Sequence, residues 1–245
     1  MTSNIAWTAA ADNLTLDLDD IHVWRVNQDV PISAVKDMAH FLTETENDRA
    51  ERFVFERDNR RFRATRAILR KLLARYLDCA PEDVHIRKGL QDKPFLDDRI
   101  NTRQLKFNIS HSNGLALMAF SLEGELGIDL EFARPEFATM EIAERFFSKR
   151  EIEDLRKLTG AEQVRAFYRC WTRKEAYVKA RGGGLQISLD SFDVSVGTES
   201  EVRLRSIDCE RWYLKSFTPA PSYEACLAME GKRRIAFLEQ EPSFL

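Results

Sequence analysis

The chain has 245 residues, of which 44% are apolar and 31% charged, and its formal net charge is −3. This composition is typical of a globular protein large enough to bury a substantial core, and the acidic balance argues against a general nucleic-acid-binding protein. No apolar run approaches the roughly 18 residues of a membrane-spanning helix, and the first residues lack the basic and apolar regions of a signal peptide. We therefore expect a cytoplasmic protein that binds neither nucleic acid nor membrane.

Cysteine and histidine spacing argues against a zinc site. The four histidines are unpaired, and the cysteines are scattered without CxxC spacing. Isolated cysteines of this kind are typical of buried, reduced thiols in a cytosolic protein. They are Cys79, Cys170, Cys209 and Cys226.

Two long helices are predicted, one in each half of the chain. Residues 57–77 and residues 162–181 both carry apolar side chains at helical spacing, and the second run ends at "GGG" (182–184), which suits a left-handed helix C-terminus. Shorter helices are expected after two capping boxes, Thr43–Glu46 and Ser148–Glu151, in which a hydroxyl and a carboxylate three residues apart satisfy the first backbone N–H groups.

The strands occur in a repeated pattern. "LKFNIS" (105–110) and "LALMAFSLEG" (115–124) predict two strands joined by the turn "HSNG", and a similar strand–turn–strand pattern recurs 107 residues later, at 212–231. Each copy follows a long helix. The repeat predicts an α+β fold of two similar halves packed as one body, residues 1–124 and 125–245.

Two carboxylates interrupt the apolar run "GIDLE". Asp129 and Glu131 are two residues apart, so in a strand their side chains point to the same face. Like charges in poorly solvated surroundings repel each other and resist ionisation unless a positive group joins them. The pattern therefore predicts a cation or a basic side chain next to both.

A third carboxylate lies on the inward face of the helix predicted at 162–181. Glu175 occupies a position of the apolar stripe, between Trp171 and Val178. A salt bridge to a neighbouring arginine is one interpretation. Together with Asp129 and Glu131, a hard divalent cation is the better one, since Mg²⁺ prefers a few carboxylates, waters and phosphate oxygens.

Two further segments offer partners for a phosphate held by such a metal. Lys179 lies one helical turn beyond Glu175 on the same face. In "FNISHS", Ser110 and His111 are expected to leave a strand at a turn, where a hydroxyl, an imidazole and free N–H groups could hold a phosphate. A lone histidine is more often structural, so the hypothesis depends on these neighbours.

Basic residues are concentrated between positions 49 and 75. This stretch holds ten arginines and lysines against three carboxylates. A solvated helix face is the simpler interpretation for most of them. The functional interpretation is a surface for an anionic partner.

Three motifs in the right order resemble one family. "FNISHS", "GIDLE" and "FFSKREIEDL…FYRCWTRKEAYVKARGGGL" are similar to the signatures of 4'-phosphopantetheinyl transferases of the surfactin-synthetase-activating type. The resemblance spans most of the chain. It implies a monomer with two α+β halves related by a pseudo-twofold axis and coenzyme A bound in the cleft between them.

The resemblance also implies an activity. Coenzyme A would donate its 4'-phosphopantetheine arm to a serine of an apo acyl or peptidyl carrier protein and release adenosine 3',5'-bisphosphate, with Mg²⁺ or Mn²⁺ as the cofactor. The carrier could serve fatty acid, polyketide or nonribosomal peptide synthesis.

By position, the resemblance assigns a role to each candidate site residue. The metal ligands would be Asp129, Glu131 and Glu175. The catalytic residues would be Glu175, which directly or through a metal-bound water takes the proton of the attacking serine, and Lys179, which contacts the transferred phosphate. The residues that bind coenzyme A would be Arg49, Arg61, Lys93, Asn108, Ser110, His111 and Lys179.

The sequence departs from the family pattern at two positions. Asp92 precedes the Lys-Pro element where the family has glycine, and Phe62 stands where some relatives have a small hydroxyl residue. Neither departure touches the three carboxylates. Two alternative functions remain: a catalytically inactive homologue that binds coenzyme A or the carrier, and another Mg²⁺-dependent nucleotide enzyme. The second would be expected to show a GxxxxGK[ST] phosphate loop, which this chain lacks.

For the carrier protein, the resemblance implies an acidic helix beside the modified serine. We expect exposed arginines of the 49–75 stretch to dock it, and charge reversal at Arg70 or Arg75 to weaken docking.

Overall fold

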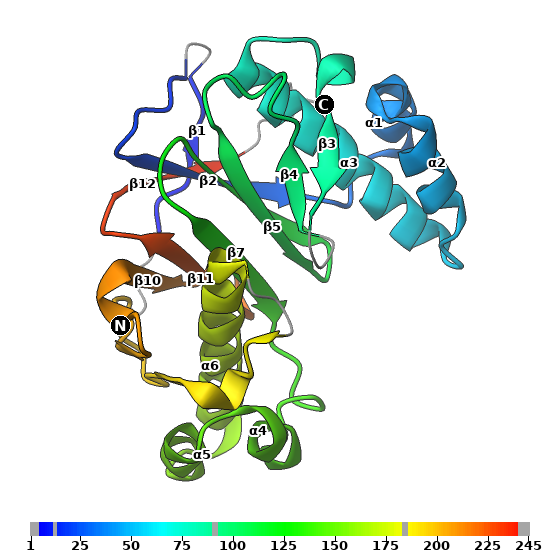
Figure 1. The fold of residues 1–245 in the computed structure, drawn as a ribbon. Coiled ribbons are helices and arrows are strands. Elements are labelled where there is room, and N and C mark those ends of the chain that lie inside the picture. The colour runs from blue at the N-terminus through cyan, green and yellow to red at the C-terminus, as the bar shows by residue number, and fades with distance from the viewer. Residues whose placement is uncertain (1–4, 12–13, 90–92, 183–185, 240–245) are drawn as a thin grey trace.

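The computed structural model describes residues 5–11, 14–89, 93–182 and 186–239 (Figure 1). The fold is mixed α+β, as predicted, with two sheets and two long helices at its centre. Within these residues no helix is both long and apolar enough to cross a membrane. Asp92, Gly183 and Gly184, which entered the sequence predictions, lie outside the described residues.

The first sheet has five strands and is covered by helix α3 (Glu56–Leu77). Its strands are antiparallel, except that β12 runs parallel to both of its neighbours. In spatial order they are β1 (Thr8–Ala9), β12 (Arg234–Glu239), β2 (Asp20–Asn27), β6 (Leu115–Ser121) and β5 (Lys106–Ser112).

The second sheet has three antiparallel strands and is covered by helix α6 (Gly160–Arg181). In spatial order they are β10 (Trp212–Phe217), β11 (Tyr223–Glu230) and β7 (Leu126–Phe132). The order β7–β11–β10 repeats the order β2–β6–β5 of the first sheet, and α3 and α6 both have 22 residues. The two halves predicted from the sequence repeat therefore share one arrangement of elements.

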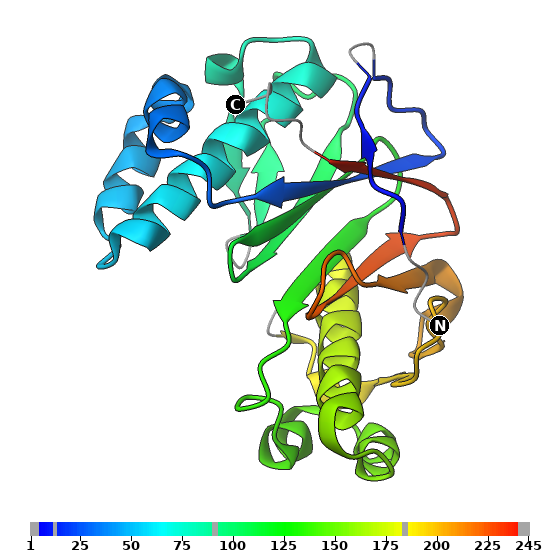
Figure 2. The ribbon, with the colours of Figure 1, turned by 180° about the vertical axis from the view of Figure 1, so that it is seen from behind.

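Each half also has smaller elements. The first half adds α1 (Ile32–Asp37), η1 (Ala39–Phe41), α2 (Glu44–Glu51), η2 (Pro81–Asp83) and the hairpin β3 (Ile86–Lys88) with β4 (Pro94–Leu96). The second half adds α4 (Met140–Phe146), α5 (Lys149–Arg156), η5 (Leu189–Ser191), β8 (Asp193–Val194), β9 (Leu204–Arg205) and η6 (Cys209–Arg211). Helices α4 and α5 lie at the far end of α6 in both views (Figures 1 and 2).

Three apolar cores separate four layers. One core lies between α3 and the first sheet, and another lies between α6 and the second sheet. The third lies between the sheets and includes Val23 of β2, Leu117 of β6, Ile128 of β7 and Leu227 of β11, all fully buried. Strands β2 and β7 are therefore largely buried on both faces, and polar side chains within them, such as His22 and Asp129, are buried as well.

Strand β12 connects the end of the chain to the first sheet. It pairs in parallel with β2 from Arg234, opposite Asp20, to Glu239, opposite Arg25. The last strand of the second half thus completes the sheet of the first. A division of the chain at residues 124 and 125 stays a prediction.

The local signals in the sequence are confirmed at helix ends. Both capping boxes form, at Thr43–Glu46 and at Ser148–Glu151, with both reciprocal hydrogen bonds in place. Helix α6 runs from Gly160 to Arg181, and its C-cap residue Gly182 has a φ of 67°, which is left-handed as predicted for this glycine.

The turn after β5 is tighter than predicted. Asn113 and Gly114 have φ angles of 47° and 91°, as in the two-residue turns that match strand twist, and β6 begins at Leu115. The prediction that "HSNG" forms the turn is therefore wrong for its first two residues, His111 and Ser112, which belong to β5 because the hairpin needs only two residues outside its strands. Ser110 lies within the strand, as "LKFNIS" predicts.

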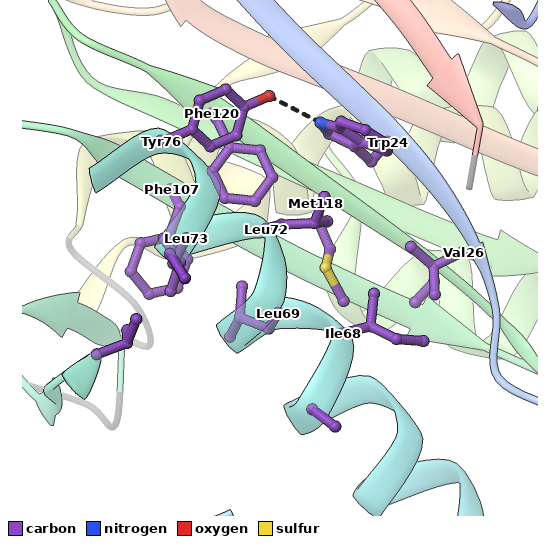
Figure 3. Close-up of a cluster of buried hydrophobic side chains, with 14 of the residues drawn as sticks. Trp24, Val26, Ile68, Leu69, Leu72, Leu73, Tyr76, Phe107, Met118 and Phe120 are labelled. Atoms are coloured by element: carbon purple, nitrogen blue, oxygen red, sulfur yellow. Dashed lines mark hydrogen bonds between the residues drawn. The ribbon is translucent and has the colours of Figure 1, made fainter. Parts of the chain in front are cut away.

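A buried polar group lies within the core under α3. The Trp24 Nε1–H donates to the Tyr76 hydroxyl oxygen over 2.8 Å (Figure 3), and this hydroxyl lies 2.7 Å from Nδ1 of His22. Since the Tyr76 oxygen accepts the indole N–H, its own proton is available to neutral His22. Burial lowers the pKa of His22 from 6.5 to about 4, with smaller and opposing effects from nearby charges.

This histidine predicts acid-sensitive stability. Unfolded His22 takes up a proton near pH 6.5, whereas folded His22 does so only near pH 4. The free energy of unfolding should therefore fall by roughly 3 kcal/mol as the pH drops through this window, on top of the contributions of carboxylates. Chemical denaturation of the wild type and of His22→Leu at several pH values measures the difference. The exposed His85 provides the control: His85→Leu should keep the wild-type slope, and an equal slope in His22→Leu would contradict the assignment.

Candidate active site

Gly127 allows helix α6 to lie directly on strand β7. A Cβ atom at this position would overlap the carbonyl oxygen of Ala176 and the amide nitrogen of Ala180, both backbone atoms of α6. Only glycine therefore permits this approach. As a consequence the last turns of α6, which carry Glu175 and Lys179, lie against the strand that carries Asp129.

The acidic cluster predicted from the sequence forms around this contact. Asp129 is buried, Glu131 and Glu175 are half-buried, and Lys179 Nζ lies 2.6 Å from Asp129 Oδ1. Lys179 Nζ also lies 3.3 Å from the Ile128 carbonyl oxygen. The other Asp129 oxygen, Oδ2, is buried and has no hydrogen-bond partner among the described residues. Lys179 is thus one positive group at the cluster, and one carboxylate oxygen remains to be satisfied.

Burial and the repulsion of neighbouring carboxylates make Glu131 and Glu175 resist ionisation. Burial, followed by the charge of Asp129, raises the pKa of Glu175. The pKa of Glu131 is raised by the same two effects in the same order, with a further contribution from Glu175. Carboxyl groups whose charges raise one another's pKa values lie close together in a poorly solvated space.

A ladder of polar side chains joins β5 to β7, which are edge strands of different sheets. Asn108 Oδ1 accepts the N–H of Ile128 over 2.8 Å, and the partners are 20 residues apart in sequence. Two more hydrogen bonds follow at intervals of two residues along each strand, and in both the partners are again 20 residues apart in sequence. Because this separation is constant, the two strands run in the same direction. The accepting atoms are Asn108 Oδ1, Ser110 Oγ and Ser112 Oγ, and the donors are the N–H groups of Ile128, Leu130 and Phe132. We call these six residues the β5–β7 ladder.

The ladder accounts for the side chains of two residues predicted to bind coenzyme A. Asn108 and Ser110 are both buried, and both satisfy N–H groups of β7. Ser110 Oγ in addition donates to Asp129 Oδ1 over 2.9 Å and lies 3.2 Å from Lys179 Nζ. These contacts place Ser110 within the acidic cluster. Direct coenzyme A binding by either residue stays a prediction.

His111 points to the opposite face of β5, where its neighbours Phe107 and Ile109 pack against the core under α3. Its ring is exposed at the edge of the sheet. Partial desolvation, followed by the positive charge of Lys179, lowers the pKa of His111. His111 and Ser110 therefore face different surroundings, although they are adjacent in sequence.

Lys93 connects the β3–β4 hairpin to the end of α6. Its Nζ donates to the carbonyl oxygen of Lys179 over 2.9 Å and lies 3.8 Å from Glu125. A cation at a helix C-terminus interacts favourably with the helix dipole. Lys93 thus contacts the backbone of Lys179, a member of the acidic cluster. Coenzyme A binding by Lys93 stays a prediction.

Arg61 and Arg49 lie at the edge of the first half. Arg61 forms a two-pronged ion pair with Asp29, at 2.7 and 2.6 Å, beside the Gly114 turn. The guanidinium of Arg49 lies over the ring of Phe62, 5.4 Å from its centre. Phe62 therefore takes part in a cation–π contact where some relatives have a hydroxyl residue.

Most of the other basic residues between 49 and 75 are committed to intramolecular pairs. Arg66 and Arg70 both bind Glu46, and Arg63 pairs with Glu51. Arg70 is 2% exposed and also donates to the carbonyl oxygens of Pro81 and Val84. The prediction that Arg70 docks the carrier is therefore wrong, because its charge is buried and satisfied. Arg75, for which docking was also predicted, donates to the carbonyl oxygen of Ala11.

The motif "WTRKEA" contains structural residues that the sequence reasoning missed. Lys174 is fully buried and contacts Glu151 at 2.8 Å and the carbonyl oxygens of Leu189 and Phe192 at 2.6 and 2.7 Å. Arg173, also fully buried, donates to three carbonyl oxygens of the segment 195–199. The signal in the sequence was the placement of these cations within an otherwise apolar helix face. They fasten the outer segments of the second half to α6.

Ser112 and Gly127 are the site residues that the sequence reasoning missed. Ser112 Oγ donates to Glu131 Oε2 over 2.8 Å, and Gly127 sets the distance between α6 and β7. A period of two could have revealed Ser112, because Ser110 and Ser112 have the same spacing as Asp129 and Glu131.

A pocket of 310 Å³ opens beside Glu131. Ser112, Glu131 and Phe132 form the end nearest the acidic cluster, and aromatic side chains of α6 form its wall. The remaining lining residues are Arg134, Phe137, Ile142, Phe167, Tyr168 and Trp171.

The cluster has the donor chemistry of a magnesium site, although its ligands are not yet arranged as one. Within the described part of the chain, no three His, Cys, Asp or Glu side chains already surround a common point as metal ligands. Lys179 Nζ lies against Asp129 Oδ1, and within the described ranges the buried Oδ2 has no hydrogen-bond partner. An unpartnered buried carboxylate oxygen beside two carboxyl groups of raised pKa fits a hard cation.

Comparisons with known proteins identify the family. Residues 125–232 match the model of the 4'-phosphopantetheinyl transferase superfamily, and residues 22–123 match the N-terminal model of 4'-phosphopantetheinyl transferases. The 4'-phosphopantetheinyl transferase HetI of Nostoc sp. is 38% identical over 225 residues, which cover 92% of this chain and 94% of the relative. The 4'-phosphopantetheinyl transferase Sfp of Bacillus subtilis is 29% identical over 205 residues, covering 82% and 89%.

Among solved structures, the holo-[acyl-carrier-protein] synthase (AcpS) of Thermotoga maritima matches 44% of this chain and 64% of its own, with 20% identity and a TM-score of 0.35. The sequence matches are sufficient by themselves to assign the family. The chain belongs to the 4'-phosphopantetheinyl transferase superfamily and is an enzyme of that class. The family and the enzyme class predicted from the motifs are confirmed.

The close contact at Gly127 gives a testable consequence. Gly127→Ala should lower the free energy of unfolding by roughly 1–3 kcal/mol or more and impair transfer, because the added methyl group pushes α6 and its carboxylate away from β7. Thermal unfolding and transfer assays measure both effects. Gly89→Ala is the matched control, since its Cβ would come no closer than 3.3 Å to a neighbouring atom. Wild-type stability and activity in Gly127→Ala would contradict the proposed packing.

Proposed function

We propose that the protein transfers the 4'-phosphopantetheine arm of coenzyme A to a serine of an apo acyl or peptidyl carrier protein, in a Mg²⁺- or Mn²⁺-dependent reaction. The serine oxygen forms a new bond to the phosphorus of the arm, the pyrophosphate bond breaks, and adenosine 3',5'-bisphosphate leaves. The observation that carries the proposal is the buried Asp129 Oδ2, which no group of the described residues hydrogen-bonds, beside Glu131, Glu175 and Lys179. We further propose that the enzyme acts as a cytoplasmic monomer.

Three carboxylates would hold the metal ion, namely Asp129, Glu131 and Glu175. A bound Mg²⁺ would supply neutralisation of the charge on the pyrophosphate and on the leaving phosphate. Glu175 takes the proton of the carrier serine. Its raised pKa suits that role, since a carboxylate of higher pKa is the stronger base.

Lys179 contacts the transferred phosphate. Its ammonium group is already located at the cluster by Asp129, Ser110 and the Ile128 carbonyl oxygen. Lys93, which is bound to the carbonyl oxygen of Lys179, keeps the end of α6 in place beneath the phosphates.

The first half of the chain binds the nucleotide end of coenzyme A. His111 is exposed on the face of β5 away from the ladder, and it would donate to the 3'-phosphate once protonated. Arg61 and Arg49 add fixed positive charge at the same edge of the half. In this arrangement Asn108 and Ser110 join β5 to β7 next to the bound coenzyme A.

A catalytically inactive homologue that only binds coenzyme A or the carrier is the alternative. Burying like charges together is unfavourable, and a protein that only binds has no use for such a cluster. The intact set of Asp129, Glu131, Glu175 and Lys179 therefore favours the transferase.

The metal and the transfer can be tested together. Wild-type protein incubated with coenzyme A, Mg²⁺ and an apo carrier should add one phosphopantetheine group to the carrier, as read by intact-protein mass spectrometry. Asp129→Ala and Glu131→Ala should both lose nearly all transfer while staying folded, and Glu131→Ala should keep a wild-type thermal midpoint or a higher one, because removing that carboxylate relieves repulsion. The exposed Glu141 gives the control variant Glu141→Ala. Full activity in the presence of EDTA would refute the metal, and an unmodified carrier with wild-type enzyme would favour the binding-only alternative.

Because Arg70 is buried, we propose instead that the carrier docks at the segment between α2 and α3. Arg52 is exposed there, and no carboxylate of the described residues lies within ion-pair distance of it. Next to it Val54 and Phe55 are 90% and 66% exposed. A positive charge beside exposed apolar side chains suits a partner that presents acidic and apolar groups.

Charge reversal at this segment should affect the carrier and not coenzyme A. Arg52→Glu should raise the KM for the carrier several-fold, with little change in kcat or in the KM for coenzyme A, because exposed charge mainly steers association. Added salt should also raise the KM for the carrier, because ions screen the attraction between exposed charges that are more than about 8–10 Å apart at physiological ionic strength. Lys36→Glu on α1 is the control for a change of net charge. A carrier KM that responds to neither salt nor Arg52→Glu would exclude this docking surface.

A further inference from the structure

The two serines of the β5–β7 ladder form the same unit twice. Ser110 Oγ accepts the N–H of Leu130 over 3.3 Å and donates to Oδ1 of Asp129 over 2.9 Å. Ser112 Oγ accepts the N–H of Phe132 over 3.1 Å and donates to Oε2 of Glu131 over 2.8 Å. Each hydroxyl thus joins the side chain of one acidic residue of β7 to the backbone N–H of the next residue of β7.

The proton of the Ser112 hydroxyl has a fixed direction. A serine hydroxyl has one proton and two lone pairs. Because the Phe132 N–H occupies a lone pair, the proton is directed to the acceptor on the other side, Glu131 Oε2. The backbone of β7 therefore orients the hydroxyl, and the hydroxyl orients the carboxylate.

Glu131 has little else to hold it in place. Lys179 Nζ is bonded to Asp129, Ser110 and the Ile128 carbonyl oxygen. Among the described residues, Ser112 provides the side-chain hydrogen bond to Glu131. The charges of Asp129 and Glu175 oppose ionised Glu131, and the 310 Å³ pocket beside it offers room to turn away.

We propose that Ser112 is a positioning residue that holds the Glu131 carboxylate toward Asp129 and thereby raises the affinity of the site for a divalent metal ion. This inference rests on the proposed function, because it assumes that Glu131 is a metal ligand. Hydrogen bonds to a ligating carboxylate fix its orientation before the metal arrives, so less freedom is lost on binding. The hydroxyl would therefore act on metal affinity and not on the chemical step.

An isosteric pair of variants isolates the hydroxyl. Ser112→Thr keeps it, whereas Ser112→Val replaces it with a methyl group of the same shape, and both residues suit a strand. Calorimetric titration of Mg²⁺ into each protein, without coenzyme A, measures metal affinity directly. We expect Ser112→Val to bind Mg²⁺ about tenfold more weakly than wild type, and Ser112→Thr to bind within about twofold of it.

Kinetics should show the same division. In Ser112→Val the Mg²⁺ concentration for half-maximal transfer should rise about tenfold, while kcat at saturating Mg²⁺ and the KM for coenzyme A stay near wild type. Ser121→Ala is the matched control, because the Ser121 hydroxyl likewise accepts a backbone N–H and donates to an oxygen, both of residue Glu123. It should leave metal affinity unchanged.

Two outcomes would overturn the proposal: equal Mg²⁺ affinity in Ser112→Val and wild type, or an equal loss in Ser112→Val and Ser112→Thr. If thermal unfolding shows that Ser112→Val does not fold, Ser112→Ala replaces it and is judged by the same criteria. Failure of the proposed function would be recognised separately, by wild-type enzyme that transfers no phosphopantetheine or does so without metal.

Discussion

The alignment of β5 with β7 is the constraint on which the site depends. Two edge strands from different sheets meet there, and side chains replace the backbone hydrogen bonds that would normally join neighbouring strands. Since strand side chains alternate, acceptors at every second residue of β5 meet N–H groups at every second residue of β7. A slip of one residue would break each contact and turn Asp129 and Glu131 to the other face.

This arrangement stores unfavourable electrostatics at the point of contact. Asp129, Glu131 and Glu175 repel one another in a poorly solvated space, which favours separation of α6 from β7. Lys179 and the two ladder serines offset part of that repulsion, and the buried basic residues of α6 fix the helix from its other side. Functional sites commonly contain unfavourable interactions of this kind, and the favourable free energy of the surrounding fold offsets them.

The arginine-rich stretch shows why charge density in a sequence is a weak guide to binding surfaces. Its charges appeared to be in excess partly because two of the partner carboxylates, Asp29 and Glu46, lie outside the stretch. Arg61 meets Asp29 across 32 residues, and Arg70 meets Glu46 across 24. Once α2 and α3 pack together, most of the apparent surface charge becomes internal structure. What remains exposed is a much smaller segment around Arg52.

The sequence by itself determined whatever depends on near neighbours along the chain. Helix limits, both capping boxes, the left-handed glycine after α6 and the common face of Asp129 and Glu131 follow from local geometry, and the three family motifs identified the enzyme class. Tertiary structure alone decided which elements meet. The direct contact of α6 with β7 at Gly127, the place of β12 beside β2 and the pairing of Ser112 with Glu131 join residues far apart in sequence, and their geometry exists only when both sheets have packed.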